Sequence, residues 1–330
     1  MPATLREPAI STRGEWECTG VYLNTATYGL PPTSAHGALL SALEDWRTGR
    51  TSEDAWEECT ERARAAFGRL VSVAPENIAI GATVSELIGL VAASLPDRSR
   101  VILADGDFAS TVFPWLVHRE RGLRIRSVPL DHLAESLDSD TAMVAFSHVQ
   151  PASGDVADLP AVLAAAKSCG TLVCVDGTQA CGWLPTDASA IDFYVCHAYK
   201  WLMSPRGAAF MTVSPQRLDR LRPLHAGWYA TADPNNNLFG LSLRLSRNTG
   251  RRLDTSPAWF SWVGTIAALE VVERIGVHTI REHDMRLANR FAAGLGLPAA
   301  RSAIVFADVA DASNKLHRAG VRASVRGGRT

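Results

Sequence analysis

The stretches TLVCVDGTQACGW (171–183) and DFYVCHAYKWL (192–202) decide the fold, because each runs from a short apolar segment into polar side chains. Both apolar segments are rich in β-branched or aromatic residues, which predicts buried strands. Asp176 ends the first strand, Gln179 follows three residues later, and Lys200 lies just beyond the second strand. Since the carboxyl ends of parallel strands meet at one edge of a sheet, we expect these side chains to lie close together.

The segments around these two strands alternate between strand and helix patterns. Further strand candidates are NIAI (77–80), VILA (101–104), IRSVPL (125–130), TAMVAFSH (141–148) and GAAFMTV (207–213), with helical patterns between most of them. The repeated unit predicts an α/β fold with a mostly parallel sheet flanked by helices. Two more helices are expected within 36–70, and helical spacing returns from Trp262.

The length of 330 residues allows about two domains. We expect an N-terminal arm over 1–35, a large domain over 36–274 and a small C-terminal α/β domain over 275–330. Residues 224–260 are rich in Gly, Asn and aromatic residues, which indicates a long functional loop within the large domain.

The charge is nearly balanced, with 33 Lys and Arg against 34 Asp and Glu. Nucleic acid and anionic membrane surfaces demand a basic excess, so we expect neither as a partner. The longest strongly apolar stretch, Leu87–Leu95, is far shorter than the ~20 residues of a membrane helix. With no apolar signal core at the N-terminus, we expect a cytoplasmic protein whose six cysteines are reduced thiols.

Lysine is scarce, since only Lys167, Lys200 and Lys315 occur. Lys167 closes a predicted helix and Lys315 lies in a polar helical stretch, whereas Lys200 is flanked by aromatic residues at a strand end. A lysine, a carboxylate and an amide at one sheet edge suit pyridoxal 5′-phosphate (PLP), because the lysine forms a Schiff base and the carboxylate holds the pyridine nitrogen protonated. Each residue taken alone has a structural alternative, a helix cap for the aspartate and a solvated charge for the lysine.

Other chemistry finds little support in the sequence. GxSxG, HExxH and phosphate-loop GK[ST] patterns are absent. The two histidines of HTIREH (278–283) are five residues apart and fall off one helical face, so we predict no metal site.

The segment DGTQACGWLPTD (176–187), followed by DFYVCHAYKWLMSPRGAAF (192–210), resembles the cofactor core of the class V aminotransferase family. That family includes cysteine desulfurases, kynureninases and isopenicillin N epimerase-like enzymes, all of fold-type I. The resemblance runs in the correct order from YLNTATYGLPP (22–32) to SPAWFSWVG (256–264). It implies a fold-type I PLP-dependent enzyme that acts on a small amino acid or amine.

The resemblance also implies roles for individual residues. Lys200 is similar to the Schiff-base lysine, Asp176 to the partner of the pyridine nitrogen and Gln179 to the contact of the ring hydroxyl O3′. Gln150, in SHVQPASG (147–154), falls near the ring hydroxyl and the substrate side.

A second group of residues resembles the family's phosphate contacts. In GATVSE (81–86), Val84 offers a backbone amide and Ser85 a hydroxyl at a helix N-terminus, which favours an anion. The alternative for Ser85 is that it caps the helix. His197 and Tyr199 fall at two further phosphate positions, although a small residue or serine is more typical where His197 stands.

Two further positions concern the ring and the quaternary structure. Phe108, in DFASTVFPW (107–115), stands where the desulfurases usually have histidine, so it can stack on the pyridine but cannot transfer a proton. A buried core phenylalanine is the alternative. Ser256, in RRLDTSPAW (251–259), resembles a residue that reaches the phosphate of the partner subunit, which implies a homodimer with a shared site.

The family pattern breaks at two places. No cysteine follows Cys196, so the late cysteine that a desulfurase uses to accept sulfur is missing. The family's late substrate-binding arginine has no complete motif here, and Arg206 or Arg247 are unassigned substitutes. The resemblance to the family implies a transaminase that uses Lys200 to move the Cα proton. The alternatives are a C–S lyase or epimerase, a sugar aminotransferase, and a catalytically idle PLP-binding regulatory or scaffold relative.

Overall fold

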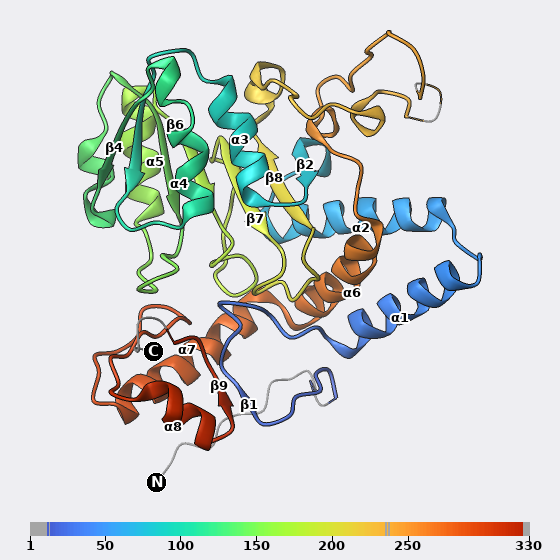
Figure 1. The fold of residues 1–330 in the computed structure, drawn as a ribbon. Coiled ribbons are helices and arrows are strands. Elements are labelled where there is room, and N and C mark those ends of the chain that lie inside the picture. The colour runs from blue at the N-terminus through green and yellow to red at the C-terminus, as the bar shows by residue number, and fades with distance from the viewer. Residues whose placement is uncertain (1–11, 13, 235, 237, 326–330) are drawn as a thin grey trace.

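The computed structural model describes residues 12, 14–234, 236 and 238–325, and a seven-stranded sheet forms its main body (Figure 1). The strand order is β2-β8-β7-β6-β5-β3-β4, and β8 alone runs antiparallel to its neighbours. The bounds are β2 (Ile78–Gly81), β3 (Arg100–Ala104), β4 (Arg124–Val128), β5 (Thr141–Ser147), β6 (Leu172–Asp176), β7 (Phe193–His197) and β8 (Ala209–Val213). The predicted mostly parallel α/β sheet is confirmed.

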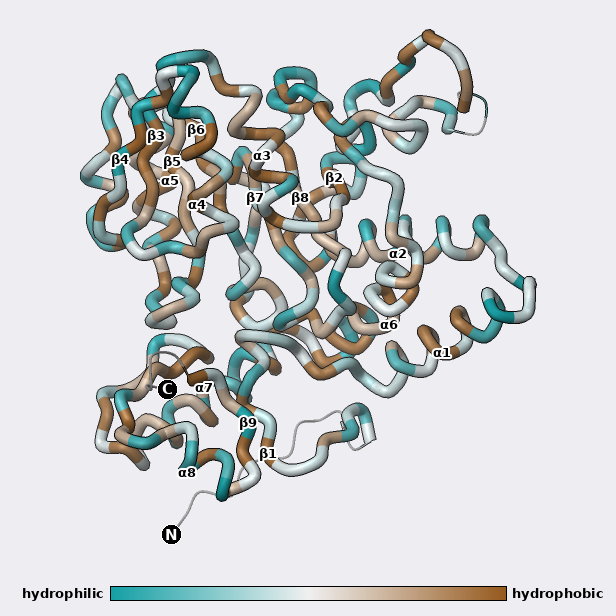
Figure 2. Tube along the Cα trace, viewed as in Figure 1, coloured by the Kyte–Doolittle hydropathy of each residue, from teal (hydrophilic) through white to brown (hydrophobic). Residues whose placement is uncertain are grey.

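Helices cover both faces of this sheet and enclose two hydrophobic clusters. α3 (Val84–Ser94) and α4 (Ala109–Leu116) lie on one face. On the other face lie α2 (Glu53–Val71), α5 (Leu159–Cys169) and α6 (Trp259–Ile275). Figure 2 shows hydrophobic colours along α3 and the neighbouring strands. Burial of these apolar faces is the main force that holds the helices on the sheet.

The N-terminal arm and the C-terminal segment meet outside the main sheet (Figure 1). β1 (Val21–Tyr22) pairs in parallel with β9 (Val321–Arg322), next to α7 (Val277–Gly294) and α8 (Ala312–Arg318). α1 (Thr33–Arg47) leads from the arm to the large sheet and packs on α6. α6 and α7 are separated at Gly276, whose φ of 85° suits a residue without a side chain. The three-part division of the chain stays a prediction.

Short 3₁₀ turns connect the regular elements. They are η1 (Pro75–Asn77), η2 (Arg119–Arg121), η3 (Leu130–His132), η4 (Ala134–Ser136), η5 (Pro215–Arg220), η6 (Trp228–Ala230) and η7 (Gly250–Leu253). The described part of the expected loop over 224–260 holds only η6, η7 and one isolated bridge before α6 begins.

One helix is shorter than its sequence pattern predicts. The segment FPWLVHRE (113–120) has a helical pattern, but α4 ends at Leu116 and η2 follows it. Gly122 then adopts a left-handed φ of 82°, which reverses the chain into β4. The spacing of apolar residues does not distinguish an α-helix from a short 3₁₀ turn, because both place these residues on nearly the same face.

No helix in the described residues has the length and apolarity needed to cross a membrane. All six cysteines carry free thiols, and Cys174, Cys181 and Cys196 are buried.

Candidate active site

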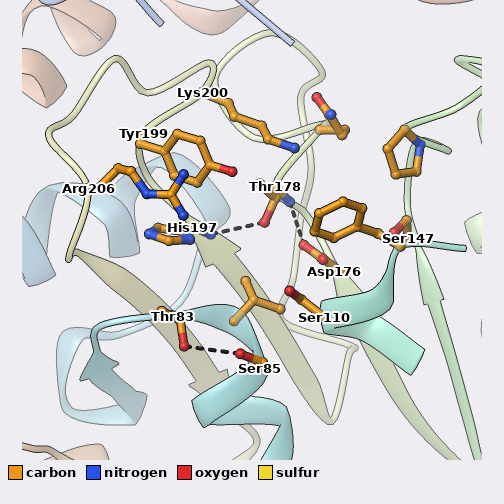
Figure 3. Close-up of a pocket in the computed structure, with 14 residues that line it drawn as sticks. Thr83, Ser85, Ser110, Ser147, Asp176, Thr178, His197, Tyr199, Lys200 and Arg206 are labelled. Carbon is orange, nitrogen blue, oxygen red and sulfur yellow. Dashed lines mark hydrogen bonds between the residues drawn. The ribbon is translucent and has the colours of Figure 1, made fainter. Parts of the chain in front are cut away.

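Three neighbouring parallel strands end at one cavity of about 320 Å³. Ser147 is the last residue of β5, Asp176 of β6 and His197 of β7, and all three line it. The N-termini of α3 and α4 close other sides of the cavity (Figure 3). The full lining is Thr83, Val84, Ser85, Phe108, Ser110, Ser147, Pro151, Asp176, Thr178, Gln179, His197, Tyr199, Lys200 and Arg206. Its size suits a small molecule.

The Asp176 carboxylate is buried and held by two donors. Thr111 Oγ1 donates to Asp176 Oδ2 at 2.8 Å, and the Thr178 amide donates to Oδ1 at 2.8 Å. These hydrogen bonds fix the orientation of the carboxylate and offset part of the cost of its desolvation. The group is therefore preset to meet a polar or cationic atom of a bound molecule.

The Lys200 side chain is buried directly beyond β7 and enters the cavity. Its Nζ lies 5.4 Å from the ring centroid of Phe108 and 5.8 Å from that of Tyr199. Aromatic faces at these distances attract the ammonium group. Figure 3 shows the amino group directed inward, on the same side of the cavity as Tyr199.

The ring of Phe108 is positioned by a carboxylate that the sequence did not reveal. Asp107 accepts hydrogen bonds from the Ser147 amide at 2.7 Å, the Ser147 hydroxyl at 2.5 Å and the Phe108 amide at 2.6 Å. Burial raises the pKa of Asp107, although these donors act in the opposite direction. Phe108 is 42% exposed, so the alternative of a buried core phenylalanine is wrong.

The α3 N-terminus presents free donors because another residue caps the helix. Thr83 is the N-cap, and its hydroxyl accepts from the Glu86 amide at 3.2 Å. Ser85 lies 3.2 Å from the same hydroxyl and lines the cavity together with Val84. The alternative that Ser85 caps the helix is therefore wrong, and the N-terminus is arranged as anion sites usually are.

His197 supplies a buried polar atom that lacks a hydrogen-bond partner among the described residues, its Nε2. Burial, with the positive charges of Arg206 and Lys200, lowers the pKa of His197 to about 4. Its backbone amide donates to Thr178 Oγ1 at 3.0 Å, and its ring packs edge-on against Tyr199 at 4.4 Å. A neutral imidazole with an unsatisfied nitrogen suits a polar group of a bound molecule.

The Gln179 amide lines the cavity and is tied to the N-terminal arm. Its Nε2 donates to the Ala26 carbonyl at 2.9 Å, and its Oε1 accepts from Trp201 Nε1 at 3.0 Å. Because an amide nitrogen has two hydrogens, one donor remains for a ligand.

Two predicted residues do not line this cavity. Gln150 is buried beyond the end of β5, where its backbone amide donates to the Asp155 carbonyl at 2.8 Å, and its Nε2 has no partner in the described part of the chain. Ser256 is exposed on the segment that leads into α6. The structure thus brings eight of the ten predicted residues together, and the roles of all ten stay predictions.

Five lining residues were not predicted from the sequence, which are Thr83, Ser110, Ser147, Pro151 and Thr178, and Arg206 was named only as an unassigned substitute for the substrate-binding arginine. Ser147 ends a strand next to Asp176, so the same sheet-edge argument finds it. Thr83 and Glu86 have the spacing of a capping box, which marks the helix start. Arg206 lies in a turn after Lys200, and neither periodicity nor strand position directs that turn to the cavity.

A family model described as aminotransferase class V matches residues 46–315. The chain belongs to the class V aminotransferase family. The members of this family are PLP-dependent enzymes, so the resemblance found in the sequence is confirmed.

Two curated relatives span most of the chain. The uncharacterized aminotransferase YcbU of Bacillus subtilis is 28% identical over 267 residues, which cover 76% of this chain and 70% of that protein. Isopenicillin N epimerase of Streptomyces clavuligerus is 28% identical over 297 residues, covering 82% and 73%.

Solved structures share the fold. The cystine C-S lyase C-DES, solved with cysteine persulfide, superposes with a TM-score of 0.81 at 20% identity, covering 92% of this chain and 89% of that chain. A variant of C-DES carries glycine covalently linked to its PLP cofactor, and it matches with a TM-score of 0.74 at 21% identity over 84% and 78% of the two chains. At these identities the likeness concerns the fold alone.

Proposed function

We propose that this protein binds PLP in the cavity at the ends of β5, β6 and β7 and acts on an amino acid or related amine. The observation that carries the proposal is the meeting of Lys200, Asp176 and the α3 N-terminus in one lining. Membership of a PLP-dependent family and a structural relative with PLP support it. Among the described residues, the buried His197 Nε2 lacks a hydrogen-bond partner, and a polar group of the cofactor would satisfy it.

When bound, PLP supplies an electron sink that stabilises negative charge at the substrate Cα. Lys200 would be the residue that holds the cofactor through its aldehyde group, and its Nζ would be the base that moves the substrate's Cα proton. Asp176, fixed by Thr111 and Thr178, keeps the pyridine nitrogen protonated. Phe108, which lines the cavity, would pack against the cofactor ring and keep water away from it.

The phosphate end is formed by the Val84 amide, the Ser85 hydroxyl, His197 and Tyr199. With its pKa lowered to about 4, His197 is neutral at physiological pH and donates one N–H. Gln179 contacts the ring hydroxyl, and Gln150 lies on the substrate side behind the lining.

The quaternary proposal is a homodimer in which Ser256 reaches the phosphate of the partner subunit. Ser256 is exposed and follows Asp254, which a buried ion pair with Arg64 holds in place. An exposed hydroxyl on an anchored segment suits a role across an interface. The cytoplasmic location also stays a proposal.

Transamination is the first candidate reaction, and two alternatives have named support. The relatives include an isopenicillin N epimerase, and a structural neighbour is a C–S lyase, so epimerisation and C–S cleavage use the same fold. A catalytically idle relative that binds PLP is the remaining alternative.

The test is a product screen with purified protein, added PLP and a panel of amino acids with and without a keto-acid acceptor. Transfer of the amino group to the acceptor identifies a transaminase. Release of sulfide or persulfide with pyruvate identifies a lyase, and deuterium uptake at Cα with loss of optical purity identifies an epimerase. Lys200→Ala must abolish the reaction, while Lys167→Ala, at the exposed end of α5, must not. A wild type that binds no PLP refutes the proposal.

A further inference from the structure

One cationic side chain in the cavity lining, Arg206, has no role in the proposed function. Among the lining residues only Asp176, Lys200 and Arg206 carry charged side chains, since His197 is neutral above its lowered pKa. Asp176 and Lys200 serve the ring nitrogen and the aldehyde carbon of the cofactor. Arg206 has no such role.

The phosphate end, in contrast, has only neutral donors. They are the α3 N-terminus, the Ser85 hydroxyl, His197 and Tyr199, whose pKa is raised mainly by burial. A phosphate monoester carries about −1.5 to −2 charges at pH 7. Bringing such an anion out of water is costly unless a cation compensates, and arginine is well suited because its fork of N–H groups matches phosphate oxygens.

The guanidinium of Arg206 lies beside the two neutral phosphate-end residues. Its Cζ is 4.5 Å from the ring centroid of Tyr199, which in turn packs 4.4 Å from His197. Figure 3 shows these three side chains grouped on one side of the cavity. Stacking on Tyr199 orients the planar guanidinium and reduces the conformational freedom that it loses on binding.

The turn that carries Arg206 is anchored to α6. Ser261 Oγ donates to the Arg206 carbonyl at 2.7 Å, and Ser204 Oγ lies 2.6 Å from Thr265 Oγ1. Gly207 has a φ of 99°, and a Cβ there would lie 2.8 Å from Ser261 Oγ. The arginine is exposed at the rim, and these contacts fix the backbone that carries it next to Tyr199.

We infer that Arg206 is the cationic phosphate-binding residue of this site, stacked on Tyr199 and acting together with the neutral donors at the α3 N-terminus. This inference rests on the proposed PLP site and deepens it. It makes the site selective for phosphorylated over unphosphorylated forms of the cofactor.

The test compares Arg206→Gln and Arg206→Lys with Arg119→Gln, an exposed arginine on η2 outside the cavity lining. The Kd values of PLP and of pyridoxal, which lacks the phosphate, are measured by absorbance titration of cofactor-free protein. We expect Arg206→Gln to raise the Kd of PLP about tenfold to a hundredfold, as for loss of a hydrogen bond to a charged group. The Kd of pyridoxal should not change, and Arg206→Lys should fall between.

A second arm measures the rise in Tm that inorganic phosphate causes in cofactor-free protein. Wild type and Arg119→Gln should show the rise, and Arg206→Gln should lose it. If phosphate stabilises all variants equally and PLP affinity is unchanged, the inference is wrong. It is also wrong if only the amino-acid concentration needed for a spectral change rises, because Arg206 then binds the substrate carboxylate.

The two arms separate this inference from the proposed function. If wild type binds no PLP, the proposed function fails, and the phosphate arm alone then decides about Arg206. If wild type binds PLP but Arg206→Gln binds it as tightly, only the inference fails.

Discussion

Removing the Asp254 carboxylate is expected to destabilise the fold by about 3 kcal/mol or more, because the guanidinium of Arg64 then stays buried without its main counter-ion. Asp254 is 0% and Arg64 4% exposed, and Arg64 Nη2 lies 2.7 Å from Asp254 Oδ2. Asp254 Oδ1 also accepts from the Ile80 amide at 2.8 Å, so the pair joins α2, β2 and the segment that leads to Ser256.

The size of the stability loss depends on which partners the remaining buried charge keeps after each substitution. Loss of one partner of a buried pair costs about 3–5 kcal/mol. Asp254→Ala falls near the lower limit, because Glu61 still lies 3.0 Å from Arg64. Arg64→Met falls near the upper limit, because Asp254 keeps only the Ile80 amide. The double variant Arg64→Met, Asp254→Leu removes both charges and should lose less than the sum of the single losses.

The assay is equilibrium unfolding in urea of the wild type, both single variants and the double variant. Glu44→Ala, which breaks an exposed ion pair with Arg47 on α1, is the matched control and should lose nothing measurable. The reasoning is refuted if Asp254→Ala behaves like this control, or if the double variant loses the full sum of the single changes.

Two further predictions concern packing and pH. Gly177→Ala should destabilise the protein and weaken PLP binding, because a Cβ there would lie 2.0 Å from the hydroxyl of the buried Tyr194. Gly89→Ala on α3 meets open space and should stabilise the protein by about 0.5–1 kcal/mol. A higher urea midpoint for Gly177→Ala than for Gly89→Ala contradicts the packing. Burial lowers the pKa of His148 to about 4 in the folded protein. As the pH drops from 6.5 to 4, this histidine is protonated in the unfolded chain but not in the folded protein, so the free energy of unfolding should fall by up to about 3 kcal/mol. His148→Gln should reduce the dependence of the urea midpoint on pH over this range without removing it, because His197 has a similarly lowered pKa, and an unchanged slope contradicts the assignment.

The sheet edge was predictable because strand ends follow from apolar periodicity alone. Asp176 ends β6, and Lys200 lies just past the end of β7. The predicted strands and their parallel arrangement are therefore enough to bring the two side chains together. The same rule reaches Ser147, which ends β5 beside Asp176. The position of Phe108 depends on where α4 begins. Asp107 holds this helix start through hydrogen bonds to Ser147 on β5, and no local sequence pattern predicts them.

Residues beyond the strand ends were harder to place. Gln150 lies three residues after β5, where a bridge between Val149 and Val156 turns the chain and takes the amide out of the cavity lining. Arg206 reaches the rim through a turn whose contacts with α6 are distant in sequence. A function for Ser256 depends on a second subunit, which the sequence of one chain cannot position.

The most direct test of the central claim is borohydride reduction of the protein mixed with PLP, followed by mass spectrometry of its peptides. We expect a visible absorption band that reduction removes, with the reduced cofactor attached to the peptide that carries Lys200. Lys200→Ala should show neither the band nor the adduct, and Lys167→Ala should show both. A wild type that stays colourless with added PLP, or an adduct on another lysine, contradicts the account.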